Sequence, residues 1–395
     1  MRNLKRLSKG DYEEWFPRSY DFTEERQIQA FLHDFKCNSI LNYVKKHAIY
    51  FKSIHKKELK RVKCPVRRYK ERYLVLPDGD KNVINVMMLK TAIAFIKYKI
   101  KLRKDVLCGT EIVKCDKNLF EILTKLGKYK GPPYSSEVLE SIKQIAPAGW
   151  SVPSFYLEYK TLMVIKEFNK YYPQSKVMGS ENIWIVKPSY SSRGIGIYCT
   201  NSPDIPDNKK LRTKIMQKYI ERTFLLSLPG PKGKLEKRKF DLRQWVLVTS
   251  YSPLVIYMFN SCYFKICGSE FVLDDIKDKY RHISNFSIQK NNERVSRSEL
   301  IMSVTQFVDH LREHFGIEID WQKDMVPKLA KIIKNTMYAG WDVIEHKSNS
   351  FELYGFDFIL DYKLNPWLIE VNRSPACSER ADWLINMLGT PSSKQ

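Results

Sequence analysis

The spacing of apolar residues divides the chain into a helical first part and a mixed second part. Apolar positions recur every three or four residues from Ile28 to Val44, after a helix-start pattern over 23–26, and again over 87–101. This period predicts amphipathic helices. Beyond Pro153, a predicted helix over 156–172 is followed by short runs rich in β-branched residues, which predict strands.

Two of these strands are predicted to form a hairpin with a glycine-containing tip. Residues 183–186 are an apolar run, and strand alternation returns from Ile195. Lys187 and a hydroxyl-rich turn with Gly194 and Gly196 lie between them, and glycine lets such a turn approach a ligand closely. The later predicted elements are strands over 216–220 and from Lys239, a basic loop over 229–238, and helices over 305–315 and 328–338.

The last predicted hairpin, over 351–372, gathers oxygen ligands on one face. Because side chains alternate along a strand, Glu370 and Asn372 share a face, and folding the hairpin sets Asp357 opposite Glu370. Two carboxylates and an amide oxygen are hard ligands of the kind that Mg²⁺ takes together with substrate phosphates. By itself, Glu-x-Asn after an apolar strand is more often a plain sheet edge.

A second charged face is predicted on the strand that opens at Lys239. The same alternation places Lys239, Asp241 and Arg243 together. Alone, this pattern is more often a surface salt-bridge ladder. With Lys187, the glycine hairpin and the acidic hairpin in this order, it supplies the cations, the metal ligands and the mobile backbone that phosphoryl transfer needs.

The charge balance points to an anionic partner. Lysine and arginine total 67 against 44 acidic residues, which gives a net charge of +23. Basic residues cluster over 56–72, 97–104 and 232–239. Such a field attracts nucleic acid, acidic lipid or acidic protein segments, and a solvated surface without a partner is the alternative.

Composition excludes several other classes. With 43% hydrophobic residues, 16 Gly and 18 Pro, the chain is neither wholly disordered nor collagen-like. No apolar run could span a bilayer and no signal peptide is visible, so we expect a cytosolic protein without membrane insertion. The eight cysteines are expected to be buried thiols. His310 to His314 matches the H-x-x-E-H zinc pattern, but an amphipathic helix explains both histidines and no third ligand can be named.

The order of these elements resembles that of the ATP-grasp ligases, and their sequence motifs resemble those of the tubulin tyrosine ligase-like family. The matching segments are 183–197 (IWIVKPSYSSRGIGI), 217–220 (QKYI), 239–248 (KFDLRQWVLV), 284–290 (SNFSIQK) and 367–375 (WLIEVNRSP). Segments 15–20 (WFPRSY) and 31–35 (FLHDF) are most similar to the tubulin glycine ligase branch. The resemblance is strong over 150–380, moderate over 1–50 and poor over 50–150.

This resemblance implies an α+β ATP-grasp fold that holds nucleotide between two α+β lobes. The implied domains are a basic, tubulin-facing N-terminal domain over 1–150, a central lobe with the glycine hairpin over 151–225, and a C-terminal lobe with the magnesium site over 226–395. ATP and Mg²⁺ are the implied cofactors. The implied nucleotide contacts are Lys187, Ser192, Arg193, Gly194, Gly196, Gln217, Lys218, Tyr219, Ile220, Lys239, Asp241 and Asn285. The implied catalytic residues are Lys239, Asp241 and Arg243, and the implied metal ligands are Asp357, Glu370 and Asn372.

The reaction implied by the resemblance joins free glycine to a glutamate side chain in an acidic tubulin tail. ATP phosphorylates the carboxylate, and the glycine amine attacks the acyl phosphate to give an isopeptide bond. The implied partners are tubulin or microtubules, with no nucleic acid, and the implied state is a monomer. A cytoskeletal location, in a cilium or axoneme, rests on the resemblance alone.

Three positions depart from the family pattern. Asn260 and Lys265 stand where the family usually has arginines, and Asn260 cannot replace a charged fork that meets phosphate. Arg373 follows Asn372, where the glycine ligases usually have a small residue. A glutamate ligase of the same family and an inactive ATP-grasp protein that binds microtubules are therefore alternatives. An RNA-binding protein is a weaker one, because no stacking platform is visible.

Overall fold

The chain divides into two compact units. A computed structural model describes residues 11–61, 84–104, 150–151, 155–188, 194–203, 213–230, 233–341, 344–345, 347 and 349–375. We call the described residues within Met1–Thr23, Ile183–Thr200 and Pro206–Gln395 the sheet unit, and those within Glu24–Asn182 and Asn201–Ile205 the helical unit. The predicted boundaries after residues 150 and 225 do not coincide with these units, and the three-domain division stays a prediction.

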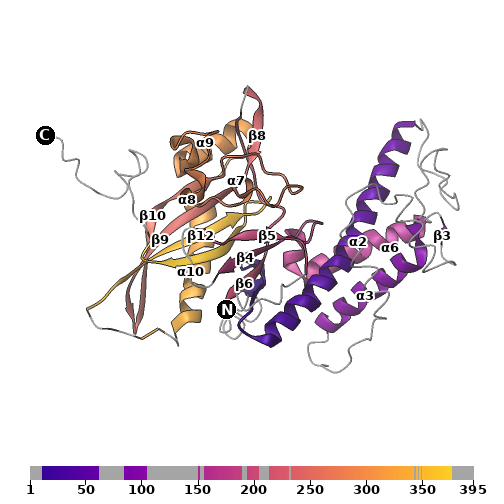
Figure 1. The fold of residues 1–395 in the computed structure, drawn as a ribbon, viewed down its shortest axis with the longest axis horizontal. Coiled ribbons are helices and arrows are strands. Elements are labelled where there is room, and N and C mark those ends of the chain that lie inside the picture. The colour runs from indigo at the N-terminus through magenta and orange to yellow at the C-terminus, as the bar shows by residue number, and fades with distance from the viewer. Residues whose placement is uncertain are drawn as a thin grey trace. The chain divides into compact units, whose positions relative to one another are not determined.

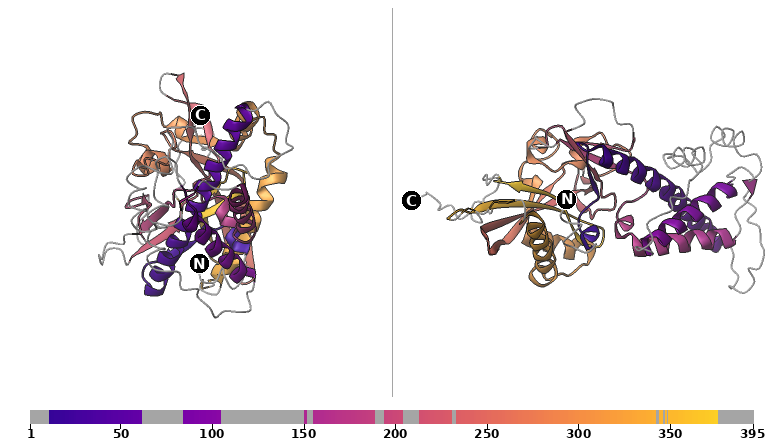
Figure 2. Two further views of the ribbon diagram at one scale, coloured as in Figure 1. Left: turned by 90° about the vertical axis from the view of Figure 1, so that its right-hand side faces the viewer. Right: turned by 90° about the horizontal axis from the view of Figure 1, so that it is seen from below.

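The helical unit is built on three helices (Figures 1 and 2). They are α2 (Glu25–Arg61), α3 (Val86–Lys104) and α6 (Phe155–Tyr171), with the 3-10 turn η2 (Pro173–Lys176) and the short pair β2 (Ile84–Asn85) and β3 (Trp150–Ser151). Their apolar faces meet in a core that includes Val44, Ile96 and Val164. All three helices were predicted. However, α2 begins at Glu25, and Thr23 lies before the helix, where its hydroxyl donates to the Asp21 carboxylate at 2.8 Å.

A small antiparallel sheet carries the glycine hairpin in the sheet unit. Its strand order is β1 (Ser19–Asp21), β6 (Lys214–Lys218), β4 (Trp184–Pro188) and β5 (Tyr198–Thr200). The antiparallel pairing of β4 with β5 confirms the predicted hairpin. Gly194 and Gly196 have φ values of 76° and 75°, the left-handed region that favours glycine.

A five-stranded antiparallel sheet forms the centre of the sheet unit. Its order is β11 (Ile301–Ser303), β10 (Leu254–Ile266), β9 (Phe240–Tyr251), β12 (Glu352–Leu360) and β13 (Pro366–Arg373). Helices α9 (Val304–Phe315) and α10 (Val326–Gly340), the latter after η6 (Trp321–Met325), pack on one face (Figure 1). Phe307 of α9 and Ile333 of α10 share that core with Leu242 and Phe356, so the other face is left for polar side chains.

Short elements complete the sheet unit. They are η1 (Asp11–Glu14), β7 (Leu226–Pro229), β8 (Leu235–Arg238), α7 (Lys279–His282), α8 (Phe286–Gln289) and η5 (Ser298–Leu300). The predicted loop over 229–238 is wrong in part, because β8 pairs with β7. Arg238 helps to fix this hairpin, since its guanidinium donates to the Pro229 carbonyl at 2.9 Å. The remaining strands and helices confirm an α+β fold.

Candidate active site

The polar face of the large sheet collects the charged residues that the sequence singled out. Asp241 and Arg243 lie on one side of β9 and Lys239 directly precedes this strand, while Leu242 points to the core. In the cross-strand register, Asp241 pairs with Lys265 of β10, and Arg243 pairs with Asp357 of β12. The predicted pairing of Asp357 with Glu370 of β13 is also present. Four neighbouring strands thus form one charged patch.

Every charge in the middle of this patch has an opposite partner. The Lys239 ammonium lies 2.9 Å from Asp241. The Arg243 guanidinium forks onto both oxygens of Asp357 at 2.5 and 2.9 Å, and the Lys265 ammonium lies 3.1 Å from the same carboxylate. Burial alone would raise the pKa of Asp357, but Lys265 and Arg243 outweigh it and lower that pKa to about 2. Asp357 is therefore ionised.

Gly355 provides the path by which Arg243 reaches Asp357. A Cβ atom placed on Gly355 would lie 2.7 Å from Arg243 Nη1, 3.1 Å from its Cζ and 2.9 Å from Pro375 Cβ. The guanidinium therefore lies directly over this glycine. The backbone of Gly355 has no positive φ, so this close approach is the reason for a glycine here.

The three predicted metal ligands come together. The Asn372 amide nitrogen donates to Asp357 at 3.2 Å, which leaves the amide oxygen available, and Glu370 faces the same space as Asp357. Two carboxylates and an amide oxygen fit Mg²⁺. Among the described residues, no group of three His, Cys, Asp or Glu side chains could hold a metal, at His310 and His314 or elsewhere. His310 Nε2 instead accepts from the Ser227 amide at 3.3 Å.

One pocket lies between the two sheets of this unit. Its empty volume is about 540 Å³ when the solvent at its open side is included. Lysines and carboxylates line one part of it, and isoleucines line another. Its lining residues are Ile185, Lys187, Ile197, Gln217, Lys218, Tyr219, Ile220, Lys239, Asp241, Lys265, His282, Ile283, Asn285, Asp357, Ile359, Ile369 and Glu370. An apolar slot beside paired cations and acids suits a planar base that carries phosphates with Mg²⁺.

Lys187 holds its ammonium between the two sheets of the unit. Its Nζ donates to the Ile369 carbonyl at 2.8 Å. Burial lowers the pKa of Lys187, and the negative charge of Glu370 acts against that shift. The foot of the hairpin is thus anchored next to the predicted metal ligands.

The glycine turn lies close to Asn285. A Cβ on Gly194 would come within 2.7 Å of Ile288 Cδ1 and 3.3 Å of the Asn285 side chain. This contact brings the hairpin, Asn285 and the pocket together. Ser192 and Arg193, two predicted nucleotide contacts, lie outside the described residues.

Two polar pocket residues, Lys265 and His282, were not among the predicted site residues. Lys265 was noted only as a departure from a family pattern, and its contact with Asp357 depends on strand pairing that one sequence does not show. His282 accepts from the Tyr219 hydroxyl at 3.0 Å through Nδ1 and donates from Nε2 to the Asp275 carbonyl at 2.9 Å. Asn260, by contrast, is exposed and lies in a β-bulge of β10.

The fold and this pocket define a protein of the ATP-grasp class. A family model described as the tubulin-tyrosine ligase family matches residues 138–389, which is more than half of the chain. The chain therefore belongs to the tubulin-tyrosine ligase family.

Curated relatives carry more specific names. The chain is 34% identical to "Tubulin glycylase 3E" of Tetrahymena thermophila over 95% of its own length and 29% of that protein. It is 28% identical to "Tubulin monoglycylase TTLL3" of Mus musculus and of Homo sapiens over 95% of its length, covering 39% and 47% of those proteins. The chain thus spans less than half of each of these relatives.

Proposed function

We propose that this chain is an ATP-dependent carboxylate–amine ligase that joins glycine to glutamate side chains in acidic tubulin tails. The observation that supports it best is the patch in which Arg243, Asp357 and Glu370 stand side by side on three strands. The names of the relatives support glycine as the amino acid and tubulin as the acceptor.

The pocket residues divide into a nucleotide part and a metal part. The segment from Gln217 to Ile220 would hold the base, and Lys187 and Lys239 would meet the phosphates, with Asn285 and the glycine turn beside them. Asp357, Glu370 and Asn372 would hold Mg²⁺, which screens phosphate charge when bound.

The reaction begins at a glutamate side chain of the acceptor. Its carboxylate oxygen takes the γ-phosphoryl group of ATP and ADP leaves. The glycine amine then attacks the carbonyl carbon of the acyl phosphate, losing a proton, and phosphate leaves as the isopeptide bond forms. Negative charge develops on the transferred group, and Lys239, Arg243 and Lys265 place buried positive charge on this face.

The acceptor tail is a polyanion, which fits the net charge of +23. Following the family resemblance, we also propose that the chain acts as a monomer in the cytoplasm, on cytoskeletal microtubules including those of cilia, without a nucleic-acid partner. Within the described residues, no helix has the length and apolar character needed to cross a membrane.

Incubation with radiolabelled glycine, MgATP and tubulin tests this function. We expect glycine incorporation that is abolished by Glu370→Gln and unchanged by Glu313→Gln, an exposed glutamate on α9. Incorporation of labelled glutamate in place of glycine would keep the ligase chemistry and reject glycine. Pelleting with microtubules without any incorporation of label would favour an inactive binding protein. Asn260, which replaces a usual family arginine, is the feature that favours this alternative.

A further inference from the structure

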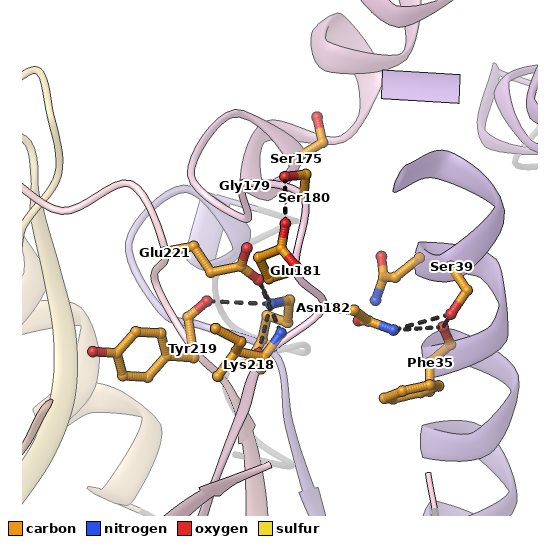
Figure 3. A network of polar contacts seen from close by, with 12 residues as sticks. Phe35, Ser39, Ser175, Gly179, Ser180, Glu181, Asn182, Lys218, Tyr219 and Glu221 are labelled. Carbon is orange, nitrogen blue, oxygen red and sulfur yellow. Dashed lines mark hydrogen bonds and ion pairs between the residues drawn. The ribbon is translucent and has the colours of Figure 1, made fainter. Parts of the chain in front are cut away.

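A buried ion pair lies at the end of β6. It is next to Tyr219 and Ile220, which line the pocket and are called the pocket floor here. Lys218 Nζ lies 2.8 Å from Glu221 Oε1, and the two side chains are 2% and 0% exposed. Figure 3 shows the two side chains pointing toward one another beside Tyr219. The family resemblance would place Lys218 on the nucleotide, but its ammonium is occupied inside the protein.

All three ammonium protons of Lys218 have acceptors. Besides Glu221, they reach the Ile183 carbonyl at 2.6 Å and the Tyr219 carbonyl at 3.3 Å. An ammonium has three donors and no acceptor, so no proton is left for a ligand. The Lys218 side chain therefore serves the protein's own backbone.

The ion pair holds both backbone groups of one residue, Ile183. The Ile183 amide donates to Glu221 Oε1 at 2.9 Å, while the Ile183 carbonyl accepts from Lys218 and from the Tyr219 amide, the latter at 3.1 Å. Ile183 directly precedes β4, the strand that carries Lys187. The pair thus joins the start of the Lys187 strand to the segment that lines the pocket floor.

We propose that Lys218 and Glu221 are positioning residues that set Lys187 and the pocket floor at a fixed spacing for the nucleotide. This inference rests on the proposed nucleotide binding. A buried ion pair often contributes little stability compared with apolar residues of similar volume. An apolar pair could not bond to the Ile183 amide and carbonyl, so the pair is explained by geometry and not by stability.

Calorimetric titration with MgATP tests the proposal. Three variants are compared with the wild type: Lys218→Met, Glu221→Leu and the double variant Lys218→Met/Glu221→Leu. We expect each to bind MgATP at least about tenfold more weakly, since a small displacement of binding groups is costly. The double variant should bind no more weakly than the weaker single variant, because both changes release the same residue.

The controls separate positioning from general destabilisation. Leu329→Ala, in the α10 core, should lower the melting temperature and leave MgATP affinity unchanged. Glu181→Gln breaks a looser ion pair, with Lys46 at 3.8 Å in the helical unit, and should also leave affinity unchanged. If a single variant fails to fold, the double variant still gives the result, because an apolar pair satisfies burial.

Two results would overturn the proposal. One is a weakened Lys218→Met variant beside a Glu221→Leu variant of wild-type affinity, which would make Lys218 a direct ligand. The other is a double variant that folds and binds MgATP like the wild type. A wild-type chain that binds no MgATP would overturn the proposed function as well, so the two failures are distinguishable.

Discussion

The two units use basic residues in opposite ways. In the sheet unit, Lys218, Lys239 and Lys265 are buried, and each has a carboxylate within 3.1 Å. In the helical unit, Lys90, Lys97 and Lys101 lie exposed along α3. The buried cations depend on specific partners at fixed distances, whereas the exposed ones act together as a field that salt weakens. The same residue type therefore gives a shaped site in one unit and a general attraction in the other.

The largest effect should come from removing the carboxylate that two buried cations share. Asp357→Asn leaves Arg243 and Lys265 buried without their partner, and we expect about 3 kcal/mol less stability. We also expect at least about a 10³-fold loss of the proposed ligase activity, because a proposed metal ligand and the partner of Arg243 and Lys265 are lost together. Urea denaturation and the glycine assay measure the two effects. A variant of wild-type stability would show that the pairing is not structural.

A more selective effect is expected at Gly355. Gly355→Ala puts a methyl group against the Arg243 guanidinium, so Arg243 must move away from Asp357. We expect kcat to fall about 100-fold with a smaller change in melting temperature, because misplacing a functional group by about 1 Å has that effect. Gly340→Ala is the control, because its Cβ would approach Ile344 at 3.3 Å and, beyond the backbone of its own helix, no other part of the described chain within 4 Å. Unchanged kcat in Gly355→Ala would mean that Arg243 needs no such path.

The exposed lysines should give a smaller, salt-dependent effect. Reversing Lys90, Lys97 and Lys101 to glutamate should weaken microtubule pelleting about tenfold at low salt, with little difference at high salt. MgATP affinity should not change. The same reversal at the exposed α10 lysines Lys328, Lys331 and Lys334 is the matched control. Equal loss in both triple variants would remove the distinction between the two units.

The last prediction concerns how pH affects the stability of the helical unit. His47 is buried on α2, where its Nδ1–H donates to the Tyr43 carbonyl at 2.7 Å, and burial lowers its pKa from 6.5 to about 4. The unfolded chain therefore binds the proton more readily between these values, so stability is complete above about pH 6.5 and falls toward pH 4. His47→Gln should flatten this part of the profile in urea denaturation. An unchanged slope would assign the acid sensitivity to other groups.

The sequence predicted the face of each site strand better than the spacing between strands. Alternation placed Asp357 opposite Glu370 correctly because the two strands of that hairpin follow one another in the sequence and each has an apolar core face. The same rule aligned Lys239, Asp241 and Arg243. These are local properties, which the period-two pattern records directly.

The contacts that the sequence did not predict join distant segments. Lys265 meets Asp357 only because β9 lies between β10 and β12, and Lys218 bonds to Ile183, 35 residues away. The β7–β8 hairpin was missed because β8, with the sequence LEKR, is mostly charged and has no clear apolar face. In each case long-range pairing decided the outcome, which local propensity does not contain.

The central strand β9 has a consequence for how this fold can vary. One side of it contributes Leu242 and Val246 to the core, and the other contributes Asp241 to the pocket and Arg243 to the ion pair with Asp357. Inserting or deleting one residue in β9 would exchange its two faces, so that the apolar side chains would face the pocket and the charged ones would be buried in the core. We therefore expect insertions and deletions to occur in the connecting turns of related proteins, whereas β9 keeps its length wherever the activity is retained.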